Sequence, residues 1–175
     1  MSHNSRSKDT VRYLTKASVF AALIFLATAY LSVPLPLMGY GHLGDGFILL
    51  AAALLPTPYA VAAAVVGAGL ADFMAGFAVY IPATVAIKAL TAILVSNKTK
   101  KLIGTRNLLA LIPAALICAC GYYLYEALIY KSFVAPLASV PLNIAQSLCG
   151  ALVFIVLGLL IDKNRGLAKI FKENN

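Results

Sequence analysis

The chain has 175 residues, of which 62% are hydrophobic and 11% charged, and its formal net charge is +8. A soluble domain carries about 25% charged residues, so this chain cannot cover itself with a polar surface. Its composition and its mean hydropathy of +0.91 therefore exclude an ordinary soluble domain and predict an integral membrane protein.

The N-terminal segment is basic and then apolar, a pattern shared by signal peptides and first membrane helices. The apolar run continues without a convincing small-residue cleavage site, so we expect a retained first helix. The cysteines Cys118, Cys120 and Cys149 lie in apolar runs without a CxxC pair. This arrangement is typical of buried thiols.

Basic residues predict the topology. Twelve of the 14 Lys and Arg residues form three clusters, within residues 6–16, 98–106 and 163–172. The positive-inside rule places all three clusters in the cytoplasm, so the chain crosses the membrane an even number of times between them. Four crossings fit the first interval and two the second, which predicts an all-α bundle of six transmembrane helices in one domain, with both termini cytoplasmic. The helices are expected near residues 12–32, 43–56, 58–78, 80–97, 108–130 and 140–162.

Small residues predict which helix faces meet. The first helix carries Ala17-x-x-x-Ala21, overlapped by Ser18-x-x-x-Ala22. Such stripes allow two helix backbones to approach closely in lipid. On spacing alone we favour packing within the bundle, with docking of another protein as the alternative. A similar stripe on the third helix comprises Ala63, Gly67, Ala71 and Ala75.

Polar residues inside the expected spans carry the functional signal, because ionisable groups there usually face a cavity or each other. All of those considered lie in the outer half of the predicted bundle, whereas a proton relay would distribute them through its full depth. Tyrosines, amides and a few charges suit a small planar heterocycle. The predicted substrate-binding residues are His42, Asp45, Tyr80, Thr84, Lys88, Tyr122, Glu126, Asn143 and Gln146.

Several of the polar residues in the expected spans also have a purely structural interpretation. Asp72 and Lys88 are expected at similar depth and could form an internal salt bridge. Asp45 could be an N-cap or a first-turn acid favoured by the helix dipole. Glu126 could point at water, and the tyrosines could form an interfacial belt. These alternatives stay open at the level of sequence.

The sequence lacks the motifs of several enzyme classes and metal sites. The sequence contains no GxxxxGK[ST], HExxH or GxSxG motif and no Cys/His cluster. His3 and His42 are too few and too far apart for a metal site. We therefore expect a binding protein that is not an enzyme and uses no metal or cofactor.

Three segments carry a family resemblance: KASVFAALIFLATAYL, GHLGDGFILLAAALLP and GLADFMAGFAVYIPATVAIKAL. The chain resembles the substrate-binding S component of energy-coupling-factor (ECF) vitamin transporters over nearly its whole length. It looks closer to the riboflavin-type branch, which includes hydroxymethylpyrimidine and pyridoxine carriers, than to the biotin or thiamine branches.

The resemblance implies a subunit in the cytoplasmic membrane of a bacterium that binds a vitamin from outside with high affinity. A transmembrane coupling subunit and two cytoplasmic ATPase subunits would power uptake. Pyridoxine or hydroxymethylpyrimidine is the expected ligand, with riboflavin second. Ala17 and Ala21 match the family's docking motif by type and position, so they and the overlapping Ser18 and Ala22 are the expected docking residues.

One further hypothesis concerns Asp45, which we expect beneath the loop at 33–42, where it orders that loop or contacts the ligand. Two other functions remain as alternatives. One is a membrane scaffold of the rod-shape-determining type. The other is a stand-alone proton-coupled carrier.

Overall fold

A computed structural model of the chain describes residues 3–34, 40–95, 97–99, 101–164, 166 and 168. Part of the expected first loop, 35–39, therefore lies outside the described residues. Four members of the expected basic clusters also lie outside them, namely Lys100, Arg165, Lys169 and Lys172.

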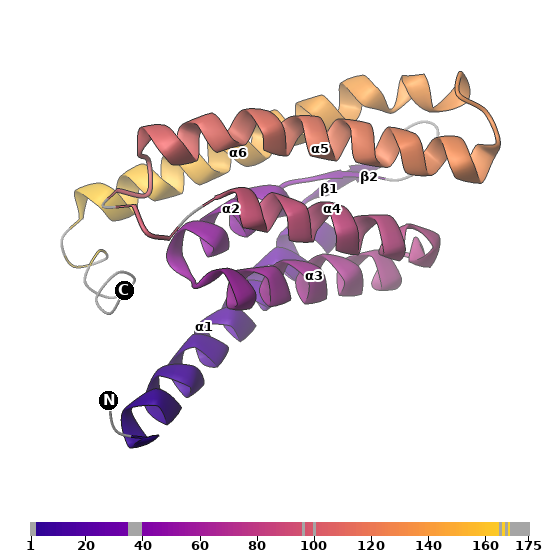
Figure 1. The fold of residues 1–175 in the computed structure, drawn as a ribbon. Helices are drawn as coiled ribbons and strands as arrows, with labels where there is room; N and C mark the ends of the chain where they lie inside the picture. The colour runs from indigo at the N-terminus through magenta and orange to yellow at the C-terminus, as the bar shows by residue number, and fades with distance from the viewer. Residues whose placement is uncertain are drawn as a thin grey trace.

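Six α-helices make up most of the described chain (Figure 1). A two-stranded antiparallel sheet and two short 3-10 helices complete it. In chain order the elements are α1 (His3–Ala29), β1 (Ser32–Pro34), β2 (Tyr40–His42), α2 (Gly44–Leu54), α3 (Thr57–Met74), η1 (Ala78–Tyr80), α4 (Ile81–Leu94), α5 (Thr105–Tyr130), η2 (Ala135–Ala138) and α6 (Val140–Lys163).

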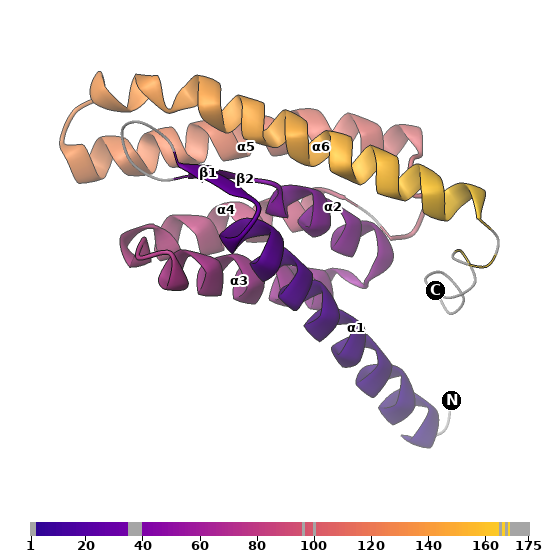
Figure 2. The same cartoon turned by 180° about the vertical axis from the view of Figure 1, so that it is seen from behind.

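The long helices pack as two pairs with a short helix between them. Helices α5 and α6 lie side by side, as do α3 and α4, and α2 contacts both α6 and α3. Helix α1 crosses α3, and its N-terminal half projects away from the bundle (Figure 2). We call the end that carries β1, β2, η1 and η2 the hairpin end of the bundle.

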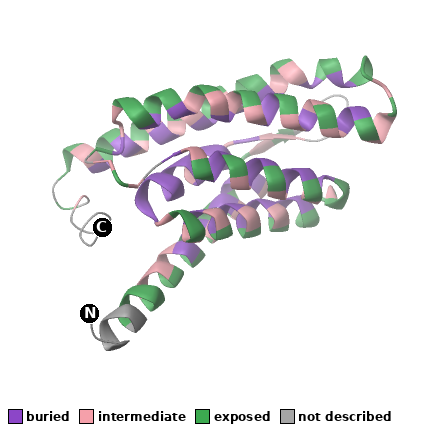
Figure 3. Cartoon of the chain, viewed as in Figure 1, coloured by how far each residue is buried: buried purple, intermediate pink, exposed green. Residues whose placement is uncertain are grey.

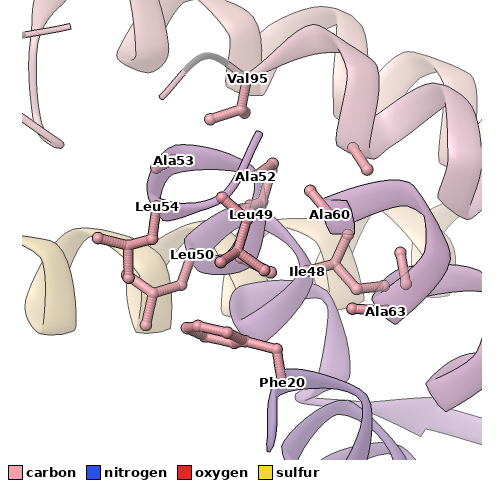
Figure 4. Packing of buried hydrophobic residues seen from close by; sticks show 14 of the residues in the cluster. Phe20, Ile48, Leu49, Leu50, Ala52, Ala53, Leu54, Ala60, Ala63 and Val95 are labelled. Atoms are coloured by element: carbon pink, nitrogen blue, oxygen red, sulfur yellow. The ribbon is translucent and has the colours of Figure 1, made fainter. Parts of the chain in front are cut away.

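The core is built around α2, which is buried on nearly all sides (Figure 3). Its residues pack against Phe20 of α1, Ala60 and Ala63 of α3, and Val95 after α4 (Figure 4). A helix that is apolar all round is stable only when other elements surround it. The composition of α2 thus explains its central position.

Close helix contacts depend on glycine. A Cβ on Gly67 of α3 would lie 2.6 Å from the Ala21 carbonyl oxygen of α1. A Cβ on Gly150 of α6 would lie 2.8 Å from the Asp45 Cβ of α2. The third-helix stripe therefore packs within the chain, except for Ala75, which is exposed beyond the end of α3.

The six predicted helices are present, with shifted ends. Four stretches are long and apolar enough to cross a membrane: Lys8–Ala29, Thr57–Met74, Thr105–Tyr130 and Ala135–Lys163. Helix α2 has 11 residues, roughly 16 Å of helix against a hydrocarbon core of about 30 Å. The stretch Ala78–Leu94 is also shorter than a standard span. Six crossings and cytoplasmic termini therefore stay predictions.

The first turn, which we expected to be a loop, instead contains a short strand pair within the mostly helical fold. Helix α1 ends at Ala29 rather than near residue 32, and Ser32–Pro34 pairs with Tyr40–His42. These strands were not predicted, and prolines usually interrupt a sheet ladder. Pro34 is tolerated here in a two-stranded sheet, where every strand is an edge.

Candidate functional site

The strand pair brings the start of α2 into the bundle. The backbone N–H of Leu43 donates to the Leu31 carbonyl at 3.3 Å. The Gly44 N–H donates to His42 Nδ1 at 3.2 Å. A Cβ on Gly44 would overlap Thr28 Oγ1, so glycine permits this close approach. As a result, Asp45 enters the bundle interior instead of staying at its edge.

Asp45 and Lys88 form a buried ion pair. Lys88 Nζ lies 2.6 Å from Asp45 Oδ1, and the two side chains are 1% and 7% exposed. Gln146 Nε2 donates to Asp45 Oδ2 at 3.0 Å, and Lys88 Nζ lies 5.4 Å from the centre of the Tyr122 ring. The ion pair is therefore held by hydrogen bonding and by a cation–π contact.

This pair decides two of the open alternatives. The suggested salt bridge between Asp72 and Lys88 is wrong, because Lys88 pairs with Asp45. The suggested N-cap is also wrong. Leu43 occupies the N-cap position of α2, and no side chain caps it. Asp45 is a first-turn acid, as the second structural interpretation stated.

A cavity lies at the hairpin end. Its empty volume is about 450 Å³, including its open mouth. Strand β2, η1 and helices α3 to α6 supply its wall. The lining residues are Tyr40, His42, Asp72, Phe77, Tyr80, Thr84, Tyr122, Glu126, Ser139, Asn143 and Gln146. We call this the hairpin-end cavity.

Seven of the nine predicted binding residues line this cavity. The exceptions are Asp45 and Lys88, which are not part of the wall. Asp45 reaches it only through Gln146, and it borders a second, smaller cavity instead. The expected direct contact between Asp45 and a ligand thus has no support from the geometry.

Two carboxylates face the cavity. Tyr40 Oη donates to Asp72 Oδ1 at 2.7 Å, while Asp72 Oδ2 is buried without a hydrogen-bond partner. Glu126 Oε1 accepts from Tyr80 Oη at 3.4 Å, and Oε2 accepts from Ser139 Oγ. Glu126 is 5% exposed, so the alternative that it points at water is wrong.

Aromatic rings form one side of the cavity. The ring centres of Tyr40 and Phe77 are 5.3 Å apart, and that of Phe77 is 6.2 Å from that of Tyr80. Tyr122 follows at 6.4 Å from Tyr80 and shares a 3.0 Å hydrogen bond with Thr84. Tyr80 and Tyr122 are buried, so these two do not belong to an interfacial belt.

His42 is neutral at physiological pH. Burial lowers its pKa from 6.5 to about 4. Its Nδ1 accepts a hydrogen bond from Gly44, so the neutral ring carries its proton on Nε2. His42 therefore brings no positive charge to the cavity wall.

Three wall residues were missed: Tyr40, Phe77 and Ser139. Each lies in a turn or short element, where the periodicity of a helix does not predict which way a residue faces. Asp72 was counted among the outer-half ionisable residues, but it was left out of the predicted binding residues because an ion pair with Lys88 stayed open. Asn107 was also missed. It is fully buried at the opposite end, where its amide donates to the Leu102 carbonyl, so the polar residues are not confined to one half.

The predicted docking residues fall on two faces of α1. Ala17 is 7% exposed, and Ala21 packs against the core beside Gly67. The prediction that Ala17 and Ala21 dock a partner conflicts with this burial, because their face is already occupied by α3. Ser18 and Ala22 are exposed.

The expectation that all three cysteines are buried is wrong. Cys118 is buried, whereas Cys120 and Cys149 are exposed. Within the described part of the chain, no group of three His, Cys, Asp or Glu residues is placed to hold a metal ion.

Comparisons with known proteins agree with this architecture. Residues 8–163 match the family model described as ECF-type riboflavin transporter, S component. A solved structure titled "Structure and mechanism of the S component of a bacterial ECF transporter" superposes with a TM-score of 0.68 at 20% sequence identity. The match covers 94% of this chain and 99% of that one, and it shows a shared fold. No curated protein matches the chain.

Proposed function

The chain belongs to the S-component family of ECF-type riboflavin transporters, and from this premise we propose that it captures a small heterocyclic vitamin or precursor in the hairpin-end cavity. S components are membrane subunits that bind the substrate for vitamin uptake. The observation that carries the proposal is the cavity itself, which combines an aromatic side with amides and carboxylates supplied by six elements. Such a site binds a planar polar ring.

The space enclosed by the walls is smaller than 450 Å³, since that volume includes the open mouth, and this favours a small ring. We therefore retain pyridoxine or hydroxymethylpyrimidine as the first candidates, with riboflavin second. Asn143 and Gln146 bring amides to the wall from one face of α6, which suits ring nitrogens and hydroxyl groups.

Transport would need partner subunits. The sequence has no P-loop, and in this family a transmembrane coupling subunit and two ATPases power uptake. We propose that α1 meets the coupling subunit through the exposed face that carries Ser18 and Ala22. The protein would then act in the cytoplasmic membrane of a bacterium, with the hairpin end outside. No specific observation favours a scaffold or a stand-alone carrier.

Native mass spectrometry of the detergent-purified chain, followed by extraction and identification of bound small molecules, tests this proposal. A copurified heterocycle supports it and names the substrate. An empty protein is then titrated with a panel of vitamins. Failure to bind any of them, together with failure to associate with a coupling subunit, contradicts the proposal and favours the scaffold.

A further inference from the structure

We infer that Asp72 selects the ligand of the hairpin-end cavity by accepting a hydrogen bond at Oδ2 from an amine group outside the ring, so that the substrate is an amine-bearing heterocycle. The inference rests on the proposed function, because it assigns a chemical class to the ligand of that same cavity.

The first support is an unmatched oxygen. Asp72 is 6% exposed and lines the cavity, and its Oδ2 has no hydrogen-bond partner. A side-chain hydrogen bond from Thr84 also contributes to the electrostatics of Asp72, although no donor meets hydrogen-bond geometry at Oδ2. The same Thr84 hydroxyl shares a 3.0 Å hydrogen bond with Tyr122, in which either oxygen can donate. A buried acceptor without a donor costs free energy, more so when it is charged. A donor on the ligand removes this cost.

The second support is the position of Asp72 in its helix. It lies in the last turn of α3, which ends at Met74. The C-terminal end of a helix carries a partial negative charge, so an acid there is unfavourable. Glu126 lies in the last turns of α5 and faces the same cavity. The N-termini of α4 and α6 reach the same cavity at Tyr80 and Ser139 and offset these dipoles, so the negative potential there comes from the two carboxylates.

The third support is the absence of a compensating cation in the described wall, since none of its lining residues is Lys or Arg. Lys88, which lies nearby, is bound to Asp45 at 2.6 Å. His42 is neutral. Both oxygens of Glu126 already accept hydrogen bonds. Among the carboxylate oxygens of the described wall, Asp72 Oδ2 is thus the one without a hydrogen-bond partner.

The aromatic wall fits the same ligand. Tyr40, which holds Asp72 Oδ1, lies against Phe77, and Phe77 lies against Tyr80. Aromatic faces attract a planar ring that carries positive charge or polarised N–H groups. The structural role of Asp72, which ties β2 to α3 through Tyr40, uses Oδ1 alone.

Binding to matched ligands tests the inference with the full chain in lipid nanodiscs. The first pair is 4-amino-5-hydroxymethyl-2-methylpyrimidine and its 4-oxo analogue. The second pair is pyridoxamine and pyridoxine, and riboflavin completes the panel. Isothermal titration calorimetry measures each affinity. We expect the amino member of at least one pair to bind about 10- to 100-fold more tightly, as a hydrogen bond to a charged group implies.

Two variants separate recognition from structure. Asp72→Asn keeps the side-chain shape and the bond from Tyr40, but it places an amide N–H₂ where Oδ2 was. We expect the preference to disappear or to reverse toward the oxo analogue. Tyr40→Phe removes the bond to Oδ1 and leaves Oδ2, so the preference for the amino member should persist. Thermal unfolding of both variants checks that they are folded.

The outcomes distinguish this inference from the proposed function. Tighter binding of pyridoxine, the oxo analogue or riboflavin than of both amino compounds overturns the inference and leaves the function in place. An amino preference that Asp72→Asn does not change also overturns it. If no compound binds, the proposed vitamin binding fails, and the inference fails with it.

Discussion

Lys88 Nζ lies 2.6 Å from Asp45 Oδ1, and Gln146 links this buried ion pair to the wall of the hairpin-end cavity. The pair joins α2 to α4, while Gln146 joins it to α6. Asp45 therefore connects three helices at the base of the proposed binding site, which explains an acid at the start of an otherwise apolar helix.

Removing one partner of this pair should destabilise the protein strongly. Lys88→Met leaves the Asp45 carboxylate buried without its cation, which costs about 3–5 kcal/mol. Asp45→Asn should have a similar effect. In the double variant no unpaired charge remains, so its loss of stability should be smaller than the sum of the two. Thermal unfolding in detergent measures all three.

The exposed Lys101→Met serves as the control for loss of a lysine charge, and its unfolding temperature should match that of the wild type. Strictly additive effects of Asp45→Asn and Lys88→Met would show that the two side chains do not interact, contrary to the structure.

Glycine placement on α3 gives a second prediction. A Cβ on Gly67 would lie 2.6 Å from a backbone oxygen of α1, whereas a Cβ on Gly69 meets nothing closer than Ile81 Cγ2 at 4.0 Å. Gly67→Ala should therefore destabilise by about 1–3 kcal/mol through overpacking. Gly69→Ala should be neutral or stabilising by up to about 1 kcal/mol, because alanine favours helix.

The same thermal unfolding experiment compares these two variants. They have the same composition and lie on the same helix, so their difference reports the contact between α1 and α3. Equal unfolding temperatures would mean that α1 does not approach α3 at Gly67.

Sequence patterns predicted the helices because apolar runs and their proline breaks are local properties. They also named Tyr80 and Thr84 as binding residues, and the structure brings both to the cavity wall. What they did not predict is which charges meet. Asp72 and Lys88 were expected at similar depth. The strand pair instead places Asp45 in the interior of the bundle, where Asp45 forms the ion pair with Lys88.

Cavity residues that lie in turns were also not predicted from the sequence. Tyr40, Phe77 and Ser139 line the cavity, but each lies outside a long helix. No periodicity relates such residues to the helix faces they approach. Their positions follow from tertiary contacts, such as the hydrogen bond from Tyr40 to Asp72, which the sequence alone does not indicate.

The buried His42 makes stability depend on pH. Its pKa is about 4 in the folded chain, against an ordinary value of 6.5. Below pH 6.5 the unfolded chain binds a proton at this residue that the folded chain does not bind. The contribution of His42 to stability should therefore fall between pH 6.5 and about 4 and level off below that range. The limiting slope is about 1.4 kcal/mol per pH unit.

His42→Asn tests this dependence, because an asparagine oxygen can accept the Gly44 N–H without titrating. Unfolding temperatures of both proteins are measured from pH 7.5 to 4. The difference between them should shrink or reverse as the pH falls. A constant difference across the range would show that His42 does not titrate differently on unfolding.

The two faces of α1 give the last prediction. Ala22 is exposed and Ala17 is buried. Small residues permit close helix contacts in lipid, so Ala22→Leu should weaken association with a coupling subunit by about 10-fold or more, as loss of roughly 1.4 kcal/mol implies. Ligand binding by the isolated chain should not change. Copurification and titration calorimetry measure the two properties separately.

Ala86→Leu, on the exposed face of α4, is the matched control and should affect neither property. Ala17→Leu should instead lower the unfolding temperature, because the added side chain meets the core. If Ala22→Leu assembles as the wild type does, the exposed face of α1 is not the docking surface. A partner contact would then have to involve another part of the bundle, since α3 already covers Ala21 beside Gly67.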